Sequence, residues 1–141
     1  NISGSLLDSW VDKFTYTIEN DERESGGSRK AAMAPELSGS MNLHHRNAWG
    51  FESILKISYK SNYYYSDSHN NKSNAYMVTD LSVAKEVGKN FILTFWGTNI
   101  LDERYSTRGF YFGLLPPDYL DQLFESYADP RQIGISITNK F

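Results

Sequence analysis

The last third of the chain decides the fold, because it reads as a strand, a long connection and a second strand. The first strand is FILTFWGTNILDERY, Phe91 to Tyr105, and the closing strand is DPRQIGISITNKF, Asp129 to Phe141. In the closing strand apolar and small or polar residues alternate, in the order Ile133, Gly134, Ile135, Ser136, Ile137 and Thr138. A period of two predicts one apolar and one polar face. Such a strand fits a membrane β-barrel with its apolar side towards lipid, and equally a half-buried strand of a soluble sheet.

Two segments of this region resemble sequence boxes of TonB-dependent outer-membrane receptors. Asn99-Ile100-Leu101-Asp102-Glu103-Arg104-Tyr105 resembles the family's "NLfDerY" box. Tyr127 to Phe141 resembles the segment that closes the family's barrels, with matching residues at Pro130, Arg131, Gly134 and Phe141. The two boxes occur in the family's order, although Asn139 stands where the family often has an aromatic residue.

The resemblance implies a barrel of about 22 strands with an N-terminal plug, which imports scarce nutrients such as iron–siderophore complexes or cobalamin. We expect residues 1–141 to be the C-terminal barrel segment, with the plug and the earlier strands outside it. The start Asn1-Ile2-Ser3-Gly4 has neither Met nor a basic leader, which favours a piece of a longer protein. The implied partners are a small nutrient ligand such as a ferric siderophore, outer-membrane lipid, and TonB through the plug. The implied location is the outer membrane of a Gram-negative cell.

Composition excludes several classes of protein. The net charge of −3 and the absence of a basic block argue against nucleic acid as a partner. The chain has no Cys, and therefore no disulfide framework and no thiolate metal site. No apolar run approaches the ~20 residues of a transmembrane helix. The mean hydropathy of −0.52 is compatible with a barrel, because half of each barrel strand faces a polar lumen.

Alternating patterns along the chain predict an all-β fold, an antiparallel up-and-down meander of about six strands that are the last strands of a transmembrane β-barrel. The predicted strands are Ser3–Ile18, Pro35–His45, Phe51–Tyr65, Ala75–Val87, Phe91–Tyr105 and Asp129–Phe141. Their connections alternate between long loops (19–29, 66–74 and 102–129) and short turns (46–50 and 86–90). We read 19–29 as a mobile, Gly-rich loop. Short turns at one end and long loops at the other are typical of outer-membrane barrels.

Aromatic residues gather at both predicted ends of the strands. The short-turn end has Trp49, Phe51, Phe91 and Phe141, and the loop end has Tyr63, Tyr64, Tyr65, Tyr76 and Tyr105. Aromatic side chains favour the two interfaces of a membrane. The sorting therefore predicts two interfacial girdles.

No pattern in the chain indicates catalysis, and we expect no enzyme, no catalytic residue, no cofactor and no metal site. GxSxG, HExxH and P-loop patterns are absent. His44 and His45 are strand neighbours and point to opposite faces, so they do not chelate one ion together. The loop with Asp67, His69 and Asn71 lacks the Gly and the bidentate Glu of a calcium loop, and reads as a turn.

The loop Asp102–Asp129 is the candidate ligand site, because loops of this length are often functional. Its aromatic residues are Tyr105, Phe110, Tyr111, Phe112, Tyr119, Phe124 and Tyr127. Aromatic faces with arginines suit an aromatic or anionic ligand. We predict ligand contacts at Arg108 and Tyr111, because Gly109 and Gly113 bracket the Phe-Tyr-Phe run and let it hinge. The alternative is a loop folded on its own aromatic cluster, with Arg131 paired to a lumen or loop carboxylate.

Two other functions compete with a receptor. A soluble antiparallel β-sheet module that binds a ligand explains the alternation and the hydropathy, but not the two family boxes. An outer-membrane barrel enzyme needs a Ser, His and Asp set on one face, and the sequence offers none.

Overall fold

The structure is a computed structural model that describes residues 1–18, 21–24 and 28–140. Every regular element in these ranges is a β-strand. The strands are β1 (Ile2–Leu6), β2 (Trp10–Val11), β3 (Thr15–Ile18), β4 (Asp21–Glu24), β5 (Arg29–Lys30), β6 (Leu37–Arg46), β7 (Phe51–Lys60), β8 (Tyr76–Val87), β9 (Phe91–Thr98), β10 (Ser106–Phe112), β11 (Gln122–Tyr127) and β12 (Gln132–Asn139). In the part of the chain that is described, no helix is long and apolar enough to cross a membrane.

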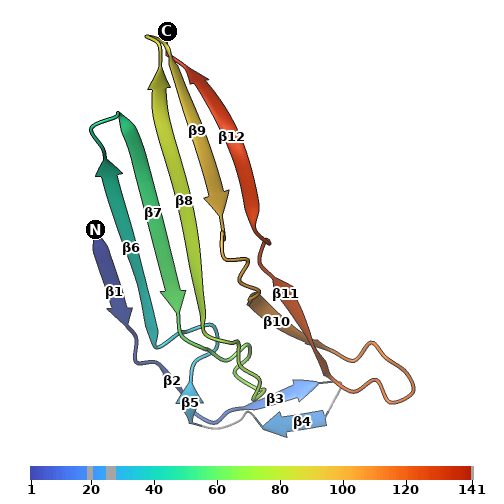
Figure 1. The fold of residues 1–141 in the computed structure, drawn as a ribbon. Helices are drawn as coiled ribbons and strands as arrows, with labels where there is room; N and C mark the ends of the chain where they lie inside the picture. Colours follow the sequence, from blue (N-terminus) through green and yellow to red (C-terminus); the bar gives the residue numbers. More distant parts are fainter. Residues whose placement is uncertain (19–20, 25–27, 141) are drawn as a thin grey trace.

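Six of the strands form one curved antiparallel sheet in the order β1-β6-β7-β8-β9-β12 (Figure 1). Strands β6 to β9 are neighbours both in sequence and in space. Hairpin β10–β11 separates β9 from β12 in the sequence, and β2 to β5 separate β1 from β6. The predicted antiparallel meander of six strands is confirmed. The sheet is open, with β1 and β12 at its edges.

The main sheet has one apolar and one polar face. Residues that lie directly opposite each other in neighbouring strands share a face. One row of the apolar face contains Leu43, Leu55, Leu81, Gly97 and Ile133, and the next row contains His45, Ser53, Val83, Phe95 and Ile135. On β12 the side chains of Ile133, Ile135 and Ile137 are 76%, 62% and 71% exposed. The alternation predicted for the closing strand is therefore present, and its apolar side is uncovered.

Several predicted strand bounds are wrong. The first predicted strand is three strands, β1 to β3, because residues 7–9 and 12–14 interrupt it with Asp8 and Asp12, a residue type depleted in strands. Strand β7 ends at Lys60, since the backbone of Tyr63 bonds to Ser73 instead of a sheet neighbour (N–O distance 2.8 Å). Part of the predicted mobile loop 19–29 forms β4, which pairs with β3, and residues 19–20 and 25–27 lie outside the described residues.

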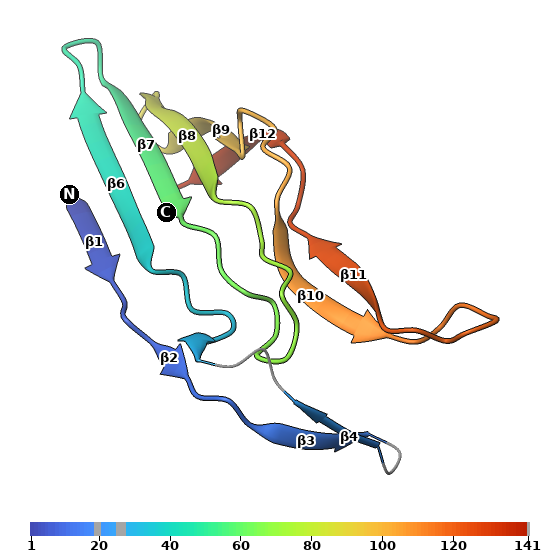
Figure 2. The same ribbon diagram turned by 90° about the horizontal axis from the view of Figure 1, so that it is seen from below.

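The long and short connections lie at opposite ends of the sheet, as predicted. Turns 47–50 and 88–90 join β6 to β7 and β8 to β9 at one end, and the remaining connections lie at the other, the loop end (Figure 1). Seen from the loop end, hairpins β3–β4 and β10–β11 project beyond the sheet (Figure 2). The prediction of a loop over residues 102–129 is wrong in one respect, because most of this segment is hairpin β10–β11.

The buried apolar core lies under the loops and not on the sheet. Among the described residues it consists of Tyr63 and Tyr65, which are 6% and 5% exposed. An interfacial girdle residue faces lipid, so the girdle prediction is wrong for these two tyrosines. At the short-turn end Trp49 and Phe91 are exposed, as the prediction requires, and Phe141 lies outside the described residues.

Candidate functional site at the loop end

The NILDERY segment is a corner that ties β9 to β12. Asn99 is buried, and its backbone N–H donates to Asp80 Oδ1 at 2.9 Å. Its side-chain amide donates to the carbonyls of Glu103 (2.9 Å) and Asp129 (3.3 Å), and its Oδ1 accepts the N–H of Glu103. Asn99 has φ of 48°, a left-handed conformation that Asn tolerates better than most residues. This conformation ends the strand at Thr98, seven residues before the end we predicted.

The second half of the corner joins the two family boxes directly. Asp102, with φ of 57°, accepts the backbone N–H of Arg131 through Oδ1 at 3.0 Å. Arg131 is thus held by its backbone, and the carboxylate pair predicted for its side chain is absent among the described residues. The ring of Tyr105 stacks on Tyr76 with a centroid distance of 4.0 Å. The residues of both boxes that form these contacts have structural roles.

Hairpin β10–β11 is docked on the loop between β7 and β8 through Tyr65. The Tyr65 hydroxyl forms a short hydrogen bond with Ser106 and donates to Glu125 Oε1 at 2.6 Å. Its ring lies against Gly109, where a Cβ would come within 2.5 Å of the ring. Burial, together with the bond to Glu125, raises the pKa of Tyr65 to about 12. The same bond lowers the pKa of Glu125.

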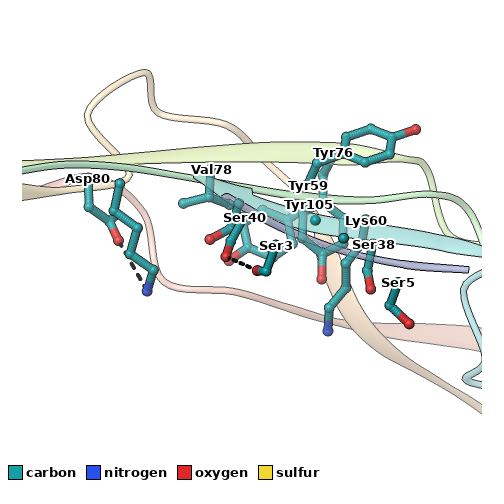
Figure 3. A pocket seen from close by; sticks show the side chains of 14 residues that line it. Ser3, Ser5, Ser38, Ser40, Tyr59, Lys60, Tyr76, Val78, Asp80 and Tyr105 are labelled. Atoms are coloured by element: carbon teal, nitrogen blue, oxygen red, sulfur yellow. Dashed lines mark hydrogen bonds and ion pairs between the residues drawn. The ribbon is translucent and has the colours of Figure 1, made fainter. Parts of the chain in front are cut away.

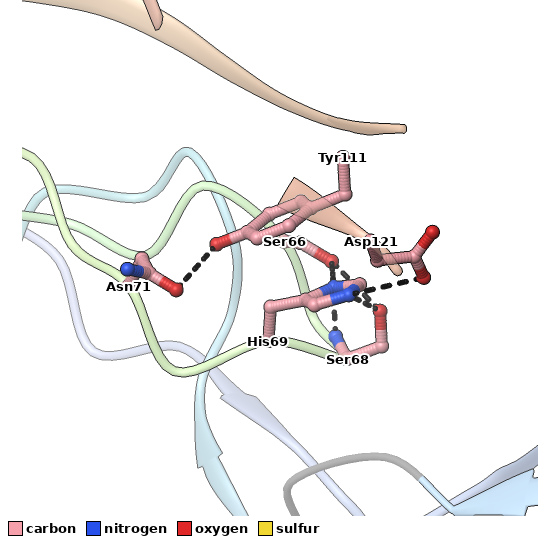
Figure 4. A network of polar contacts seen from close by, with 6 residues as sticks. All are labelled: Ser66, Ser68, His69, Asn71, Tyr111 and Asp121. Atoms are coloured by element: carbon pink, nitrogen blue, oxygen red, sulfur yellow. Dashed lines mark hydrogen bonds and ion pairs between the residues drawn. The ribbon is translucent and has the colours of Figure 1, made fainter. Parts of the chain in front are cut away.

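A second contact docks the far end of the hairpin (Figure 4). The rings of His69 and Tyr111 stack at a centroid distance of 3.6 Å and an angle of 10°. His69 Nδ1 lies 2.9 Å from Ser68 Oγ, and His69 Nε2 lies 3.8 Å from Asp121 Oδ2. The Tyr111 hydroxyl donates to Asn71 Oδ1 at 3.1 Å. In the described part of the chain, no group of three or more His, Cys, Asp or Glu residues is arranged to hold a metal ion.

The two predicted ligand contacts, Arg108 and Tyr111, lie on opposite faces of the hairpin. Tyr111 is on the docked face. Arg108 is exposed and has no ion pair with any described residue. It shares the other face, here called the hairpin outer face, with three exposed aromatic residues, Phe110, Phe112 and Phe124. The ring of Phe112 lies 6.2 Å from the rings of Phe110 and Phe124.

The hairpin outer face escaped the sequence analysis because 102–129 was read as a loop. The run STRGFYF, residues 106–112, contains the signal that could have found it. From Arg108 onwards every second residue is large, and Gly109 marks the face that packs closely. A bulge at Thr107 shifts the register before that point and weakens the pattern.

The polar face of the main sheet has a hollow of about 550 Å³ next to this region (Figure 3). Hydroxyl groups from β1, β6 and β7 line it, and Ser3 Oγ lies 2.9 Å from Ser40 Oγ. Its charged residues are Lys56, Lys60 and Asp80, and Lys56 Nζ is 4.0 Å from Asp80 Oδ2. Such a surface can hydrogen-bond an oxygen-rich, anionic molecule. The strand register brings these serines together from distant parts of the sequence.

The strands near the N-terminus are fastened to the same loop end. The Arg29 side chain is buried and donates to Asn70 Oδ1 (2.8 Å) and to the Ser66 carbonyl (2.6 Å). Its guanidinium lies 4.4 Å from the centroid of the Tyr64 ring. The loop between β7 and β8 is thus held from two sides, by the N-terminal strands and by the hairpin.

Comparisons with known proteins give the fold and no family assignment. No family model and no curated protein matches the sequence. Among solved structures, the ferric yersiniabactin uptake receptor FyuA from Yersinia pestis is similar to 99% of this chain, with a TM-score of 0.65 and 15% identity. The chain spans 20% of the length of that receptor chain. At this identity the similarity shows that the chain has an antiparallel all-β fold like part of that receptor.

Proposed function

We propose that this chain is part of the barrel wall of an outer-membrane receptor for TonB-dependent uptake of a scarce nutrient, most simply a ferric siderophore. The observation that carries the proposal is the two-faced, open main sheet. Its apolar side chains are uncovered on one side, and hydroxyl, amide and charged groups occupy the other. In water the apolar face would stay exposed to solvent at a large cost in free energy, whereas in a membrane lipid covers it.

The receptor class and the ligand class have separate support. The two sequence boxes resemble those of TonB-dependent receptors, and the hydrogen bonds between side chains of the first box and backbone groups of the second fit a shared architecture. FyuA is a receptor for the uptake of a ferric chelate, which favours an iron chelate as the cargo here. TonB would act through a plug domain outside residues 1–141.

We propose that the ligand contacts the hairpin outer face, with Arg108 as the cationic anchor for an anionic group of the ligand. The exposed rings of Phe110 and Phe124 form the next cross-strand pair beside Arg108 on this face and offer stacking surface for aromatic groups. Tyr111 contacts ligand only when the hairpin moves off His69, because its ring and hydroxyl are both engaged. Both residues thus remain proposed ligand contacts, at different stages of binding.

The proposal is tested on the product of the complete gene that encodes this chain. We expect the product to need detergent for extraction, to resist unfolding by SDS without heating, and to bind one of a panel of radiolabelled ferric chelates or cobalamin on whole cells. Arg108→Gln should weaken that binding about tenfold, the loss of a charge-assisted contact. Arg104→Gln, at the strand corner, is the matched control and should bind normally.

A gene product that is soluble without detergent would overturn the proposal and favour the soluble binding module. Binding that is equal in Arg108→Gln and the unmodified receptor would remove Arg108 from the site while leaving the receptor assignment in place.

A further inference from the structure

One lysine stands on the apolar face of the main sheet. Lys85 of β8 lies opposite Phe51 of β7 and Leu93 of β9, and Leu93 lies opposite Ile137 of β12. Within the described strands of this sheet, Lys85 is the one Asp, Glu, Lys or Arg on that face. The opposite face has charged residues of both signs, such as Glu52, Lys56 and Asp80.

Lys85 contacts an aromatic ring and has no acidic partner among the described residues. Its side chain is exposed, and its Nζ lies 4.4 Å from the centroid of the Phe51 ring. It forms no ion pair with the described residues, whereas Lys30 is paired with Asp8 and Lys140 with Glu86. An ammonium group on a face covered by lipid needs a partner that the lipid itself supplies.

The position of Lys85 along β8 shows which part of the lipid its ammonium group can reach. From Met77 to Val87, which are both exposed, the apolar face of β8 extends over ten residue steps, or ~33 Å along the strand at ~3.3 Å per residue. Strands of outer-membrane barrels tilt by roughly 40°, so the rise along the membrane normal is ~25 Å, the height of the apolar band. Lys85 therefore lies one row, or ~5 Å, inside the edge of the band, from where a lysine side chain reaches the headgroups.

The surroundings of Lys85 have the composition of a membrane interface. Phe91 and Trp49 are exposed at the same short-turn end of the sheet (Figure 1). Aromatic residues and snorkelling lysines both favour the headgroup level. At that level the anionic group within reach of an ammonium is a lipid phosphate.

We propose that Lys85 binds the phosphate of an anionic phospholipid in the leaflet at the short-turn end. The lipid's acyl chains then extend from the row of Lys85 over Phe95 and Ile135 towards the middle of the apolar band, and the Phe51 ring orients the ammonium group through the cation–π contact. This inference rests on the proposed function, because it requires the apolar face to be in a membrane.

The test is native mass spectrometry of the intact receptor in detergent, titrated with phosphatidylglycerol and, separately, with zwitterionic phosphatidylcholine. We expect tighter binding of phosphatidylglycerol, and a loss of about fivefold in its affinity in Lys85→Gln, which corresponds to about 1 kcal/mol per lysine at the headgroup level. Lys85→Arg should keep the affinity. Lys140→Gln is the matched control, since Lys140 lies at the same end but is paired with Glu86.

Two results would overturn the inference while leaving the receptor assignment intact. One is unchanged phosphatidylglycerol affinity in a Lys85→Gln receptor that still resists SDS. The other is an equal loss in Lys140→Gln, which would make the effect one of net charge. A gene product that needs no detergent and binds neither lipid would overturn the receptor assignment as well.

Discussion

At the scale of single residues, Asn99 illustrates what the sequence could and could not predict. The box around it was found from sequence, and both boxes lie where the structure joins β9 to β12. We nevertheless predicted a strand through Tyr105, because Asn and Asp tolerate a left-handed φ but do not require it, and the alternation does not reveal it at Asn99 and Asp102. The corner depends on bonds to Asp80 and Asp129, which are distant in sequence, and local patterns do not encode such partners.

The two faces of β12 give a prediction at this scale. Ile135 is on the apolar face and Ser136 is on the polar face, where its hydroxyl accepts the Trp96 indole N–H at 2.9 Å. We expect Ile135→Arg to lower the free energy of unfolding in liposomes by roughly 2–4 kcal/mol, and Ser136→Arg to lower it much less. The measurement is a urea titration of the intact receptor in lipid vesicles. Equal costs at the two positions would show that β12 has no lipid side.

The pair of Tyr65 and Glu125 makes docking of the hairpin dependent on pH. The pKa of Tyr65 is raised from 10.0 to about 12, so its contribution to docking is complete below pH 10 and is lost as the pH rises towards 12. The pKa of Glu125 is lowered from 4.5, so its contribution is complete above pH 4.5 and is lost as the pH falls below that value.

We therefore expect the hairpin to be most firmly docked between about pH 5 and 10. The measurement is the mobility of a spin label at the hairpin tip, followed across the pH range. Tyr65→Phe should weaken the alkaline limb, because its titrating hydroxyl is gone, and the remainder comes from Tyr111, whose pKa is also raised by burial. A label whose mobility is unaffected by pH in the unmodified receptor would contradict this account.

At the scale of elements, the strands of the main sheet were predictable and the loop-end elements were not. Strands β6 to β9 alternate over eight to twelve residues, and their two faces differ in polarity, so their sequences keep a clear period. Hairpin β10–β11 packs one face on Tyr65 and His69 and exposes aromatic residues on the other. Both faces of the hairpin are therefore partly apolar, and its sequence does not show a clear period of two.

Docking of the hairpin depends on the absence of a side chain at Gly109. We expect Gly109→Val to displace the hairpin, because a Cβ at this position meets the Tyr65 ring at 2.5 Å. Hydrogen exchange at the amides of β10 should become faster, and binding of the ferric chelate on whole cells should weaken. The main sheet should keep its resistance to SDS, since none of its strands pairs with β10.

Thr107→Val is the control for that experiment, because it enlarges no contact with Tyr65 and removes one hydrogen bond at the bulge. Ligand binding that survives displacement of the hairpin would leave the polar hollow beside Ser40 and Lys56 as the main binding surface.

At the scale of the whole molecule, the main sheet is open and has two edge strands, β1 and β12. Strand β1 pairs with β6 and strand β12 pairs with β9, so each has one side without a strand partner in the described chain. The sequence predicted this arrangement from the number of strands and their order. It could not predict how the loop between β7 and β8 holds the loop end together, because Arg29 and Glu125 reach it from opposite ends of the chain.

The two free edges give the last prediction. Backbone N–H and C=O groups that lack partners are not tolerated in lipid, so β1 and β12 need neighbouring strands before the sheet can insert. We expect residues 1–141 expressed alone to fail to form an SDS-resistant species in lipid vesicles, while the complete gene product succeeds. In the complete product, hydrogen exchange at the outward-facing amides of Ile2–Leu6 and Gln132–Asn139 should be slow. A monomeric, SDS-resistant barrel formed by residues 1–141 alone would mean that the two edges pair with each other, and the chain would then be a small barrel of its own.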